Sequence, residues 1–337
     1  MGSLRIWTKS GRAAWVAIVV LAAGVGAAMP RPAFALASCA TTIAACGCQA
    51  DTAAVYETSG PLTSASMTTD CIDVTASGAV LVLTGNITGP GGGVTADGIH
   101  VTSGASNVFI WGLATTGVFP LSANAVVGGF ATGVQVDGSN AEIDRLNANG
   151  NITNGVVFNN VTGGDYDDSE ADSNTGGDGV LVSAGSGNVV GDSETDLNND
   201  GIVMASTSNN RILDSGASSN KVYGIWFGQS SGNEINGSGT NSNATGTYFG
   251  CFSSGGPTGA KCPSGMTNSL FNSMTNSGGN KNSDDGVAID LGDSGNVIDE
   301  SGGSSNTTDD AVDKNKKCDH NTWMEDGFST VSQSCIH

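Results

Sequence analysis

The stretch NNRILDSGASSNKVYGIWF, residues Asn209–Phe227, decides the fold. It is rich in Gly, Asn and Ser, as a linker would be, but its single apolar residues stand at positions that recur elsewhere. The segment Gly224-Ile225-Trp226-Phe227 has counterparts that begin at Gly98, Gly133, Gly155, Gly179, Gly201, Gly246 and Gly286. From Gly133 to Gly246 these glycines are 22, 24, 22, 23 and 22 residues apart. The stretch is therefore one unit of a repeat.

Two asparagine positions keep step with this anchor glycine. The first lies about nine residues after it, at Asn107, Asn140, Asn188, Asn210, Asn233 and Asn296. The second lies about nineteen residues after it, at Asn174, Asn198, Asn220, Asn243 and Asn306. A period of this length indicates a solenoid, and short alternating apolar segments between Gly, Asn and Ser indicate strands. We predict an all-β, right-handed parallel β-helix of nine or ten coils, with three short strands per coil and asparagines stacked at the turns.

The order Gly-Ile-x-Val, then Asn-x-Ile, then Asn resembles the parallel β-helix repeat of pectate-lyase-like proteins, over roughly Ile72–Asp313. That superfamily includes pectate lyases, polygalacturonases, alginate epimerases and periplasmic copper-processing proteins. The resemblance implies the fold and leaves the activity open, because one fold hosts many activities.

The ends of the chain suggest export and capping. Arg5, Lys9 and Arg12 precede an apolar run and a cluster of small residues, which predicts a signal peptide over residues 1–37 and a secreted or periplasmic protein. We expect a Cys-rich N-terminal cap over 38–71, the β-helix over 72–313 with an excursion at 250–285, and a disulfide-closed C-terminal cap over 314–337. Lipidation at Cys39 stays open, and no membrane span is expected after the signal peptide is removed.

The net charge limits which partners are expected, and the cysteines indicate disulfides. The 337 residues carry a formal charge of −20, which disfavours nucleic acid and anionic lipid as partners. All eight cysteines lie in the exported part, where disulfides are expected. Cys251–Cys262 and Cys318–Cys335 are the expected short-range pairs, whereas Cys39, Cys46, Cys48 and Cys71 allow three connectivities.

Catalytic candidates are weak. The resemblance to polygalacturonases points to Asp284 and Asp285, and the resemblance to lyases points to Arg211 as a base. The Gly-His-Gly and Arg-Ile-Lys motifs of polygalacturonases are absent. Aspartates also precede the anchor glycine at Asp97, Asp178 and Asp200, so this residue type belongs to the repeat.

An acidic row offers a metal site. Asp144, Asp168, Asp192 and Asp214 are expected on four successive coils about 5 Å apart, where like charges repel unless solvent screens them or a cation binds. Ca²⁺ is the cation that such oxygen ligands suit. The three histidines, His100, His320 and His337, are too scattered in sequence to predict a copper site.

An outward row offers a binding surface. The second residue after the anchor glycine points away from the core, and on successive coils it includes Leu181, Val203, Trp226 and Tyr248. It predicts a platform for sugar rings, a subunit contact, or a face covered by the excursion or a terminal segment. We expect a non-catalytic β-helix that binds polysaccharide or a cell-surface glycan. A polysaccharide lyase, epimerase or hydrolase, and a periplasmic accessory protein for metal or cofactor delivery, are the alternatives.

Overall fold

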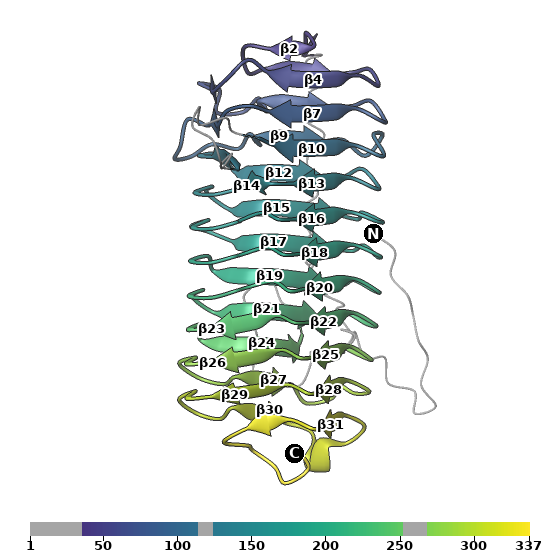
Figure 1. The fold of residues 1–337 in the computed structure, drawn as a ribbon, viewed down its shortest axis with the longest axis vertical. Helices are drawn as coiled ribbons and strands as arrows, with labels where there is room; N and C mark the ends of the chain where they lie inside the picture. The colour runs from purple at the N-terminus through teal and green to yellow at the C-terminus, as the bar shows by residue number, and fades with distance from the viewer. Residues whose placement is uncertain (1–35, 114–123, 252–267) are drawn as a thin grey trace, which may run out of the picture. The chain divides into compact units, whose positions relative to one another are not determined.

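Two long parallel sheets build the protein (Figure 1). The computed structural model describes residues 36–113, 124–251 and 268–337, so the expected signal peptide, except its last two residues, and Cys262 lie outside the described residues. Residues Leu36–His337 form one unit. Every strand pairs in parallel with its counterpart on the neighbouring coil, which confirms the β-helix.

The first long sheet has twelve strands. They are β1 (Ala37–Ser38), β3 (Cys48–Ala50), β6 (Ile72–Val74), β9 (Ile99–Val101), β12 (Thr132–Val136), β15 (Asn154–Asn159), β17 (Asp178–Ser183), β19 (Asp200–Ala205), β21 (Tyr223–Gly228), β24 (Thr245–Gly250), β27 (Val287–Ile289) and β30 (Ala311–Asp313).

The second long sheet also has twelve strands. They are β2 (Thr42–Ile43), β4 (Val55–Thr58), β7 (Val80–Leu83), β10 (Phe109–Gly112), β13 (Glu142–Asp144), β16 (Asp165–Asp167), β18 (Val189–Gly191), β20 (Arg211–Leu213), β22 (Glu234–Asn236), β25 (Ser273–Thr275), β28 (Val297–Asp299) and β31 (Thr322–Met324). The stack therefore exceeds the nine or ten coils that we expected.

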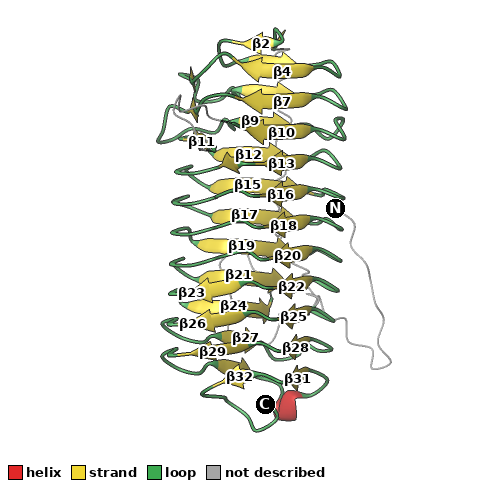
Figure 2. Ribbon diagram, viewed as in Figure 1, coloured by secondary structure: helices red, strands yellow, loops and turns green. Residues whose placement is uncertain are grey.

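The third strand of each coil is present only toward the two ends. One short sheet contains β5 (Leu62–Thr63), β8 (Ile87–Thr88), β11 (Ala125–Gly128) and β14 (Leu146–Asn147). The other contains β23 (Gly239–Asn241), β26 (Gly278–Asn280), β29 (Gly302–Ser304) and β32 (Gly327–Phe328). Between them, single bridges such as Glu170–Glu194 and Glu194–Gly216 replace the strands. Turns occupy most of the rest, and the short 3₁₀ helix η1 (Lys316–Cys318) follows β30 (Figure 2).

The anchor glycine is required because there is no room for a side chain. A Cβ at Gly201 would lie 2.5 Å from the carbonyl oxygen of Gly224 and 2.8 Å from the side-chain nitrogen of Asn220. Gly155 and Gly179 meet the equivalent atoms of their own neighbouring coils at 2.6–2.8 Å. The recurring glycine thus allows the coil to bend tightly against the next one.

The buried asparagines form two ladders, as we predicted for most of them. In each ladder a side-chain oxygen accepts a hydrogen bond from the backbone N–H of the preceding ladder residue, for example Asn198 N–H to Asn220 Oδ1 at 2.9 Å. One ladder runs through Asn151, Asn174, Asn198, Asn220, Asn243, Asn282 and Asn306. The other runs through Asn188, Asn210, Asn233, Asn272, Asn296 and Asn321.

Asn107 and Asn140 do not belong to the second ladder. Strand pairing aligns Phe109 with Glu142, so both asparagines lie one position before the ladder. They adopt left-handed backbone with φ of 54° and 53°, at a turn where Asn is favoured. The sequence spacing was misleading because these coils differ in length by one or two residues.

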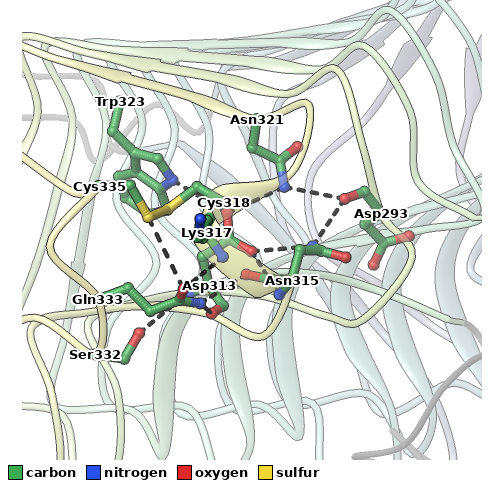
Figure 3. Close-up of a disulfide and its surroundings, with 10 residues drawn as sticks. All are labelled: Asp293, Asp313, Asn315, Lys317, Cys318, Asn321, Trp323, Ser332, Gln333 and Cys335. Carbon is green, nitrogen blue, oxygen red and sulfur yellow. Dashed lines mark hydrogen bonds between the residues drawn. A yellow bond between two sulfur atoms is a disulfide. The ribbon is translucent and has the colours of Figure 1, made fainter.

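Disulfides lie at both ends. Cys39 pairs with Cys48 and Cys46 with Cys71, which resolves the three connectivities left open by the sequence. The Cys-rich segment is itself coiled, since β1–β5 already belong to the sheets. At the other end Cys318 pairs with Cys335, as predicted (Figure 3). In the described part of the chain, no helix is long and apolar enough to span a membrane.

Candidate metal centre

Acidic residues surround His100 on the outer face of the first long sheet. His100 of β9 is in register with Asp73 of β6 on one side and with Gln135 of β12 on the other. Asp70 lies two residues before β6 and Asp97 two residues before β9, so they hold equivalent positions on neighbouring coils. The backbone N–H of Cys71 donates to the carbonyl of Asp97 where these two coils stack. Neighbouring coils thus bring together residues that are 27 to 30 positions apart in sequence.

Asp70, Asp97 and His100 each direct one ligand atom to the same place. These three atoms all lie within 4.8 Å of one another, and both aspartates are buried while His100 is half-buried. His100 Nδ1 is 3.5 Å from Asp70 Oδ2 and 3.9 Å from Asp73 Oδ1. Asp70 Oδ1 also accepts the backbone N–H of Asp97 at 2.7 Å, which holds its carboxylate in position.

The carboxylates change the acidity of the imidazole. Burial lowers the pKa of His100, but hydrogen bonds to Asp137 and Asp70 and the negative charge of both raise it to about 10. The ring therefore carries both protons at neutral pH when no metal is bound. A metal ion at Nδ1 would take the place of one of these protons.

A pocket adjoins the cluster. Its volume is about 230 Å³, and Asp70 lines it together with Cys46, Ser64, Ser66 and Thr69. Asp70 therefore belongs both to the cluster and to the lining of a hollow that also presents the hydroxyl groups of Ser64, Ser66 and Thr69.

The donor set suits a divalent transition-metal ion. One imidazole nitrogen and two carboxylates are ligands that Cu²⁺, Zn²⁺ and Ni²⁺ accept, whereas Cu⁺ prefers thiolate and thioether sulfur. The cysteines that the structure describes are all disulfide-bonded, so they supply no thiolate. The residues present fit a divalent transition-metal ion, which Asp70, Asp97 and His100 would hold.

The predicted catalytic residues are not brought together. Asp284 and Asp285 precede β27 of the first long sheet, and Asp285 accepts the backbone N–H of Asp309 at 3.3 Å. Burial, and then the charge of Asp284, raise the pKa of Asp285 to about 6. Arg211 lies three coils earlier in β20 of the second long sheet, where its Nε is 3.2 Å from Glu234. Asp178 and Asp200, which are in register, show that an acid before the anchor glycine is a repeat feature.

The acidic row differs by one residue from the expected one. Asp144 is in register with Asp167, so Asp168 stacks after Arg145 rather than after Asp144. Asp168, Asp192 and Asp214 do occupy the same exposed bend on three successive coils, with φ of 50°, 42° and 48°. Arg145 Nε, 3.3 Å from Asp168, ends the row with a positive charge.

The outward row is not exposed at its centre. Val203, Trp226 and Tyr248 point away from the coil interior and form a separate apolar cluster, in which Leu181 is only partly buried. Trp226 and Tyr248 each expose only 3% of their surface, and Tyr223 stacks on Tyr248 with ring centroids 4.6 Å apart. Of the three alternatives for this row, the burial of Trp226 and Tyr248 fits a covered face and does not fit an open aromatic platform. Most of the expected excursion, residues 252–267, lies outside the described residues.

The sequence analysis missed the cluster because its members belong to different coils. His100 was noted as a lone histidine, and Asp97 only as a repeat residue. Asp70, Asp73 and Asp137 were not singled out. Aligning the coils by their anchor glycine would have placed His100 and Gln135 at one position, which is the signal that was available. Asp73 would have escaped this alignment, because its coil has Cys71 in place of the glycine.

Stacked parallel coils with two asparagine ladders define a parallel β-helix protein. A family model described as periplasmic copper-binding protein (NosD) matches residues 91–276, and the chain belongs to that family. The match includes Asp97, His100 and Asp137 but not Asp70. No curated protein matches the chain.

Solved structures share the fold at low sequence identity. ORF18 of Geobacillus virus E2 has a TM-score of 0.53 at 10% identity, covering 82% of this chain and 52% of that protein, so this chain spans about half of its length. The A-module of mannuronan C-5 epimerase AlgE6 from Azotobacter vinelandii has a TM-score of 0.42 at 13% identity, covering 83% and 86%. A GH87 α-1,3-glucanase catalytic domain has a TM-score of 0.41 at 12% identity, covering 87% and 65%.

Proposed function

We propose that this protein binds a divalent transition-metal ion, copper(II) first among them, through Asp70, Asp97 and His100. The observation that carries the proposal is the convergence of these three ligand atoms within 4.8 Å. A family described as periplasmic and copper-binding supports the choice of metal. Three protein ligands leave coordination positions open, as in sites that exchange their ligands. Of the three ligands, Asp70 also lines a pocket in which a small molecule would lie beside the site.

The test is a titration of the metal-free protein with Cu²⁺ against a competing chelator. We expect one tight site, with at least a tenfold loss of affinity in His100→Gln and in Asp97→Asn. Glu300→Gln is the matched control, because it also removes one carboxylate charge but lies on an exposed bend of the second long sheet. Equal affinity in all four proteins, or no tight site at all, would make the cluster a structural ion-pair network and reject the proposal.

Calcium at the exposed row is a second metal candidate. The identical bend of Asp168, Asp192 and Asp214 on successive coils supports it, because carboxylates about 4.8 Å apart repel without a cation. Millimolar Ca²⁺ added after EDTA should raise the melting temperature of the wild-type protein. Asp192→Asn should remove that increase, and an increase that persists in the variant would place calcium elsewhere.

Polysaccharide binding is a second candidate function. Its support is an aromatic pair on the outer face of β10, where Phe109 and Trp111 are half-buried with ring centroids 6.4 Å apart. Glu142 and Asp144 lie beside these two rings on the next coil, where carboxylates can accept hydrogen bonds from sugar hydroxyls. We expect Trp111→Ala to lose binding on a glycan array. The folded Trp226→Ala protein should retain binding, because the ring of Trp226 is buried. Binding that is indifferent to Trp111 would contradict this assignment.

A further inference from the structure

The two nitrogens of His100 have different surroundings. Nε2 is 3.0 Å from Asp137 Oδ2, within hydrogen-bond distance. Nδ1 faces the opposite way, toward Asp70 at 3.5 Å and Asp73 at 3.9 Å. One nitrogen is therefore tied to a carboxylate, and the other is directed at the cluster.

Asp137 is itself held in place and is not a member of the cluster. Its Oδ1 accepts hydrogen bonds from Gln135 Nε2 at 2.8 Å and from Asn159 Nδ2 at 3.0 Å, and its Oδ2 accepts from His100. Both oxygens are thus engaged on the side of the ring away from Asp70 and Asp97. A carboxylate bound in this way cannot turn toward the cluster without breaking three hydrogen bonds.

The strands make this arrangement rigid. His100 is central to β9, Gln135 is in register with it in β12, and Asn159 ends β15 on the coil after that. The ligands Asp70 and Asp97 precede His100 in the sequence, whereas Asp137 and the two residues that hold it follow His100. The imidazole therefore has a ligand side at Nδ1 and a supporting side at Nε2.

We propose that His100 binds the metal through Nδ1 and that Asp137 is the positioning residue that enforces this choice. This inference rests on the metal site proposed above and adds the binding atom and the residue that selects it. Asp137 keeps the proton on Nε2, orients the ring, and makes Nδ1 the stronger donor. Such carboxylate–histidine–metal arrangements typically contribute about 10- to 100-fold in affinity.

The first experiment is a Cu²⁺ competition titration of Asp137→Ala. We expect its affinity to fall about 10- to 100-fold relative to wild type, with one site per chain retained. Asp137→Asn keeps one acceptor oxygen and loses the charge. Its Cu²⁺ affinity should lie between that of the wild-type protein and that of Asp137→Ala. Glu300→Ala removes one carboxylate charge from a distant exposed bend and should bind as wild type, which separates positioning from general electrostatics.

The second experiment reads the binding nitrogen directly. Exposed His320 and His337 are replaced by Gln so that His100 is the only histidine, and the ¹⁵N-labelled protein is loaded with Zn²⁺ as a diamagnetic probe. We expect the NMR shifts of a metal-bound Nδ1 and a protonated Nε2, and a changed Nε2 shift in Asp137→Ala. If Asp137 had only a structural role, the metal would stay on Nδ1 in Asp137→Ala with the affinity of the wild-type protein.

The outcomes separate the two proposals. Wild-type affinity in Asp137→Ala, or a metal-bound Nε2, would overturn the role of Asp137 while leaving the metal site intact. Absence of any tight site in the wild-type protein would overturn both. The side chain of Asp137 is half-buried and lies outside the apolar core, and unchanged circular dichroism would confirm that Asp137→Ala folds.

Discussion

At the scale of single residues, buried polar groups carry much of the specificity of this fold. Most of them are paired, but Asp293 is an exception among the described residues. It is fully buried, its Oδ1 accepts the backbone N–H of Ser269 at 2.6 Å, and its Oδ2 has no hydrogen-bond partner. Burial, together with the charges of Asp290 and Asp313, raises the pKa of Asp293 to about 7.

This shift predicts that stability falls as pH rises. The unfolded carboxyl has the ordinary pKa of 3.8, so between about pH 4 and 7 the folded state binds the proton that the unfolded state has lost. The stabilisation is full below this window and absent above it. Asp293→Asn should flatten the dependence and be the more stable protein at pH 8, by an amount on the order of 1 kcal/mol or more.

Urea unfolding at pH 4.5, 6 and 8 measures the difference between the two proteins. Other buried acids with raised pKa values, such as Asp285 and Asp326, contribute to both proteins and cancel in that difference. A constant difference across the three pH values would show that Asp293 does not titrate in this range.

The asparagine ladder makes a second prediction at this scale. Asn220 is buried, donates to the carbonyl of Thr195 at 2.8 Å, and accepts the N–H of Asn198 at 2.9 Å. Asn220→Ala leaves both backbone groups without their partner, which should reduce the free energy of unfolding by about 1–3 kcal/mol. Asn236→Ala, on the outer face of β22, is the control and should change it by less than about 0.5 kcal/mol. Similar values for the two variants would mean that the ladder adds nothing to stability.

At the scale of elements, the anchor glycine sets how closely one coil approaches the next. A Cβ at Gly201 would lie less than 3.0 Å from its nearest neighbours, among them a backbone oxygen that cannot move away without displacing the main chain. By contrast, a Cβ at Gly216 would have its nearest neighbour, Glu194 Cγ, at 3.8 Å. Two glycines of one coil therefore have different roles.

Gly201→Ala should accordingly destabilise the protein by about 1–3 kcal/mol or more, the usual cost of overpacking. Gly216→Ala should be neutral or slightly stabilising, because the site has room and alanine restricts the unfolded chain. Chemical denaturation of both variants gives the comparison. Tolerance of alanine at Gly201 would show that the coils can separate at little cost.

At the scale of the whole molecule, each coil contacts only its neighbours, so stability is a sum of nearest-neighbour terms. The terminal coils have one neighbour each and depend on other restraints. At the C-terminus, Asp313 accepts hydrogen bonds from Asn315, Asn321 and Trp323 beside the Cys318–Cys335 disulfide (Figure 3). This disulfide closes a loop with a sequence separation of 17.

Removing the Cys318–Cys335 disulfide should destabilise the last coils locally and leave the central coils as stable as before. A loop of this length contributes about 3 kcal/mol in the chain-entropy model. In Cys318→Ala/Cys335→Ala, hydrogen exchange should accelerate in β30 and β31 and stay slow in β17 and β19. Uniform acceleration along the chain would contradict nearest-neighbour stability and indicate one cooperative unit.

The sequence by itself determined the class of fold and the positions of the coils. The anchor glycines and most ladder asparagines repeat at nearly constant spacing through the central coils. Their physical reasons, no room for a Cβ and a buried turn, hold from one central coil to the next. Local exceptions such as Asn107, and the loss of the third strand in the central coils, were not predictable. They follow from one-residue differences in coil length and from turn geometry.

Only the tertiary structure showed which residues form the candidate site and that the centre of the outward row is buried. Asp70, Asp97 and His100 meet because residues about one coil apart are placed side by side by strand register, which a linear reading does not reveal. Trp226 and Tyr248 point outward, as the alternation of a strand requires, yet they are buried. The period of a repeat determines whether a side chain points toward the core or away from it. Which residues then pack against that side chain depends on contacts that only the folded chain makes.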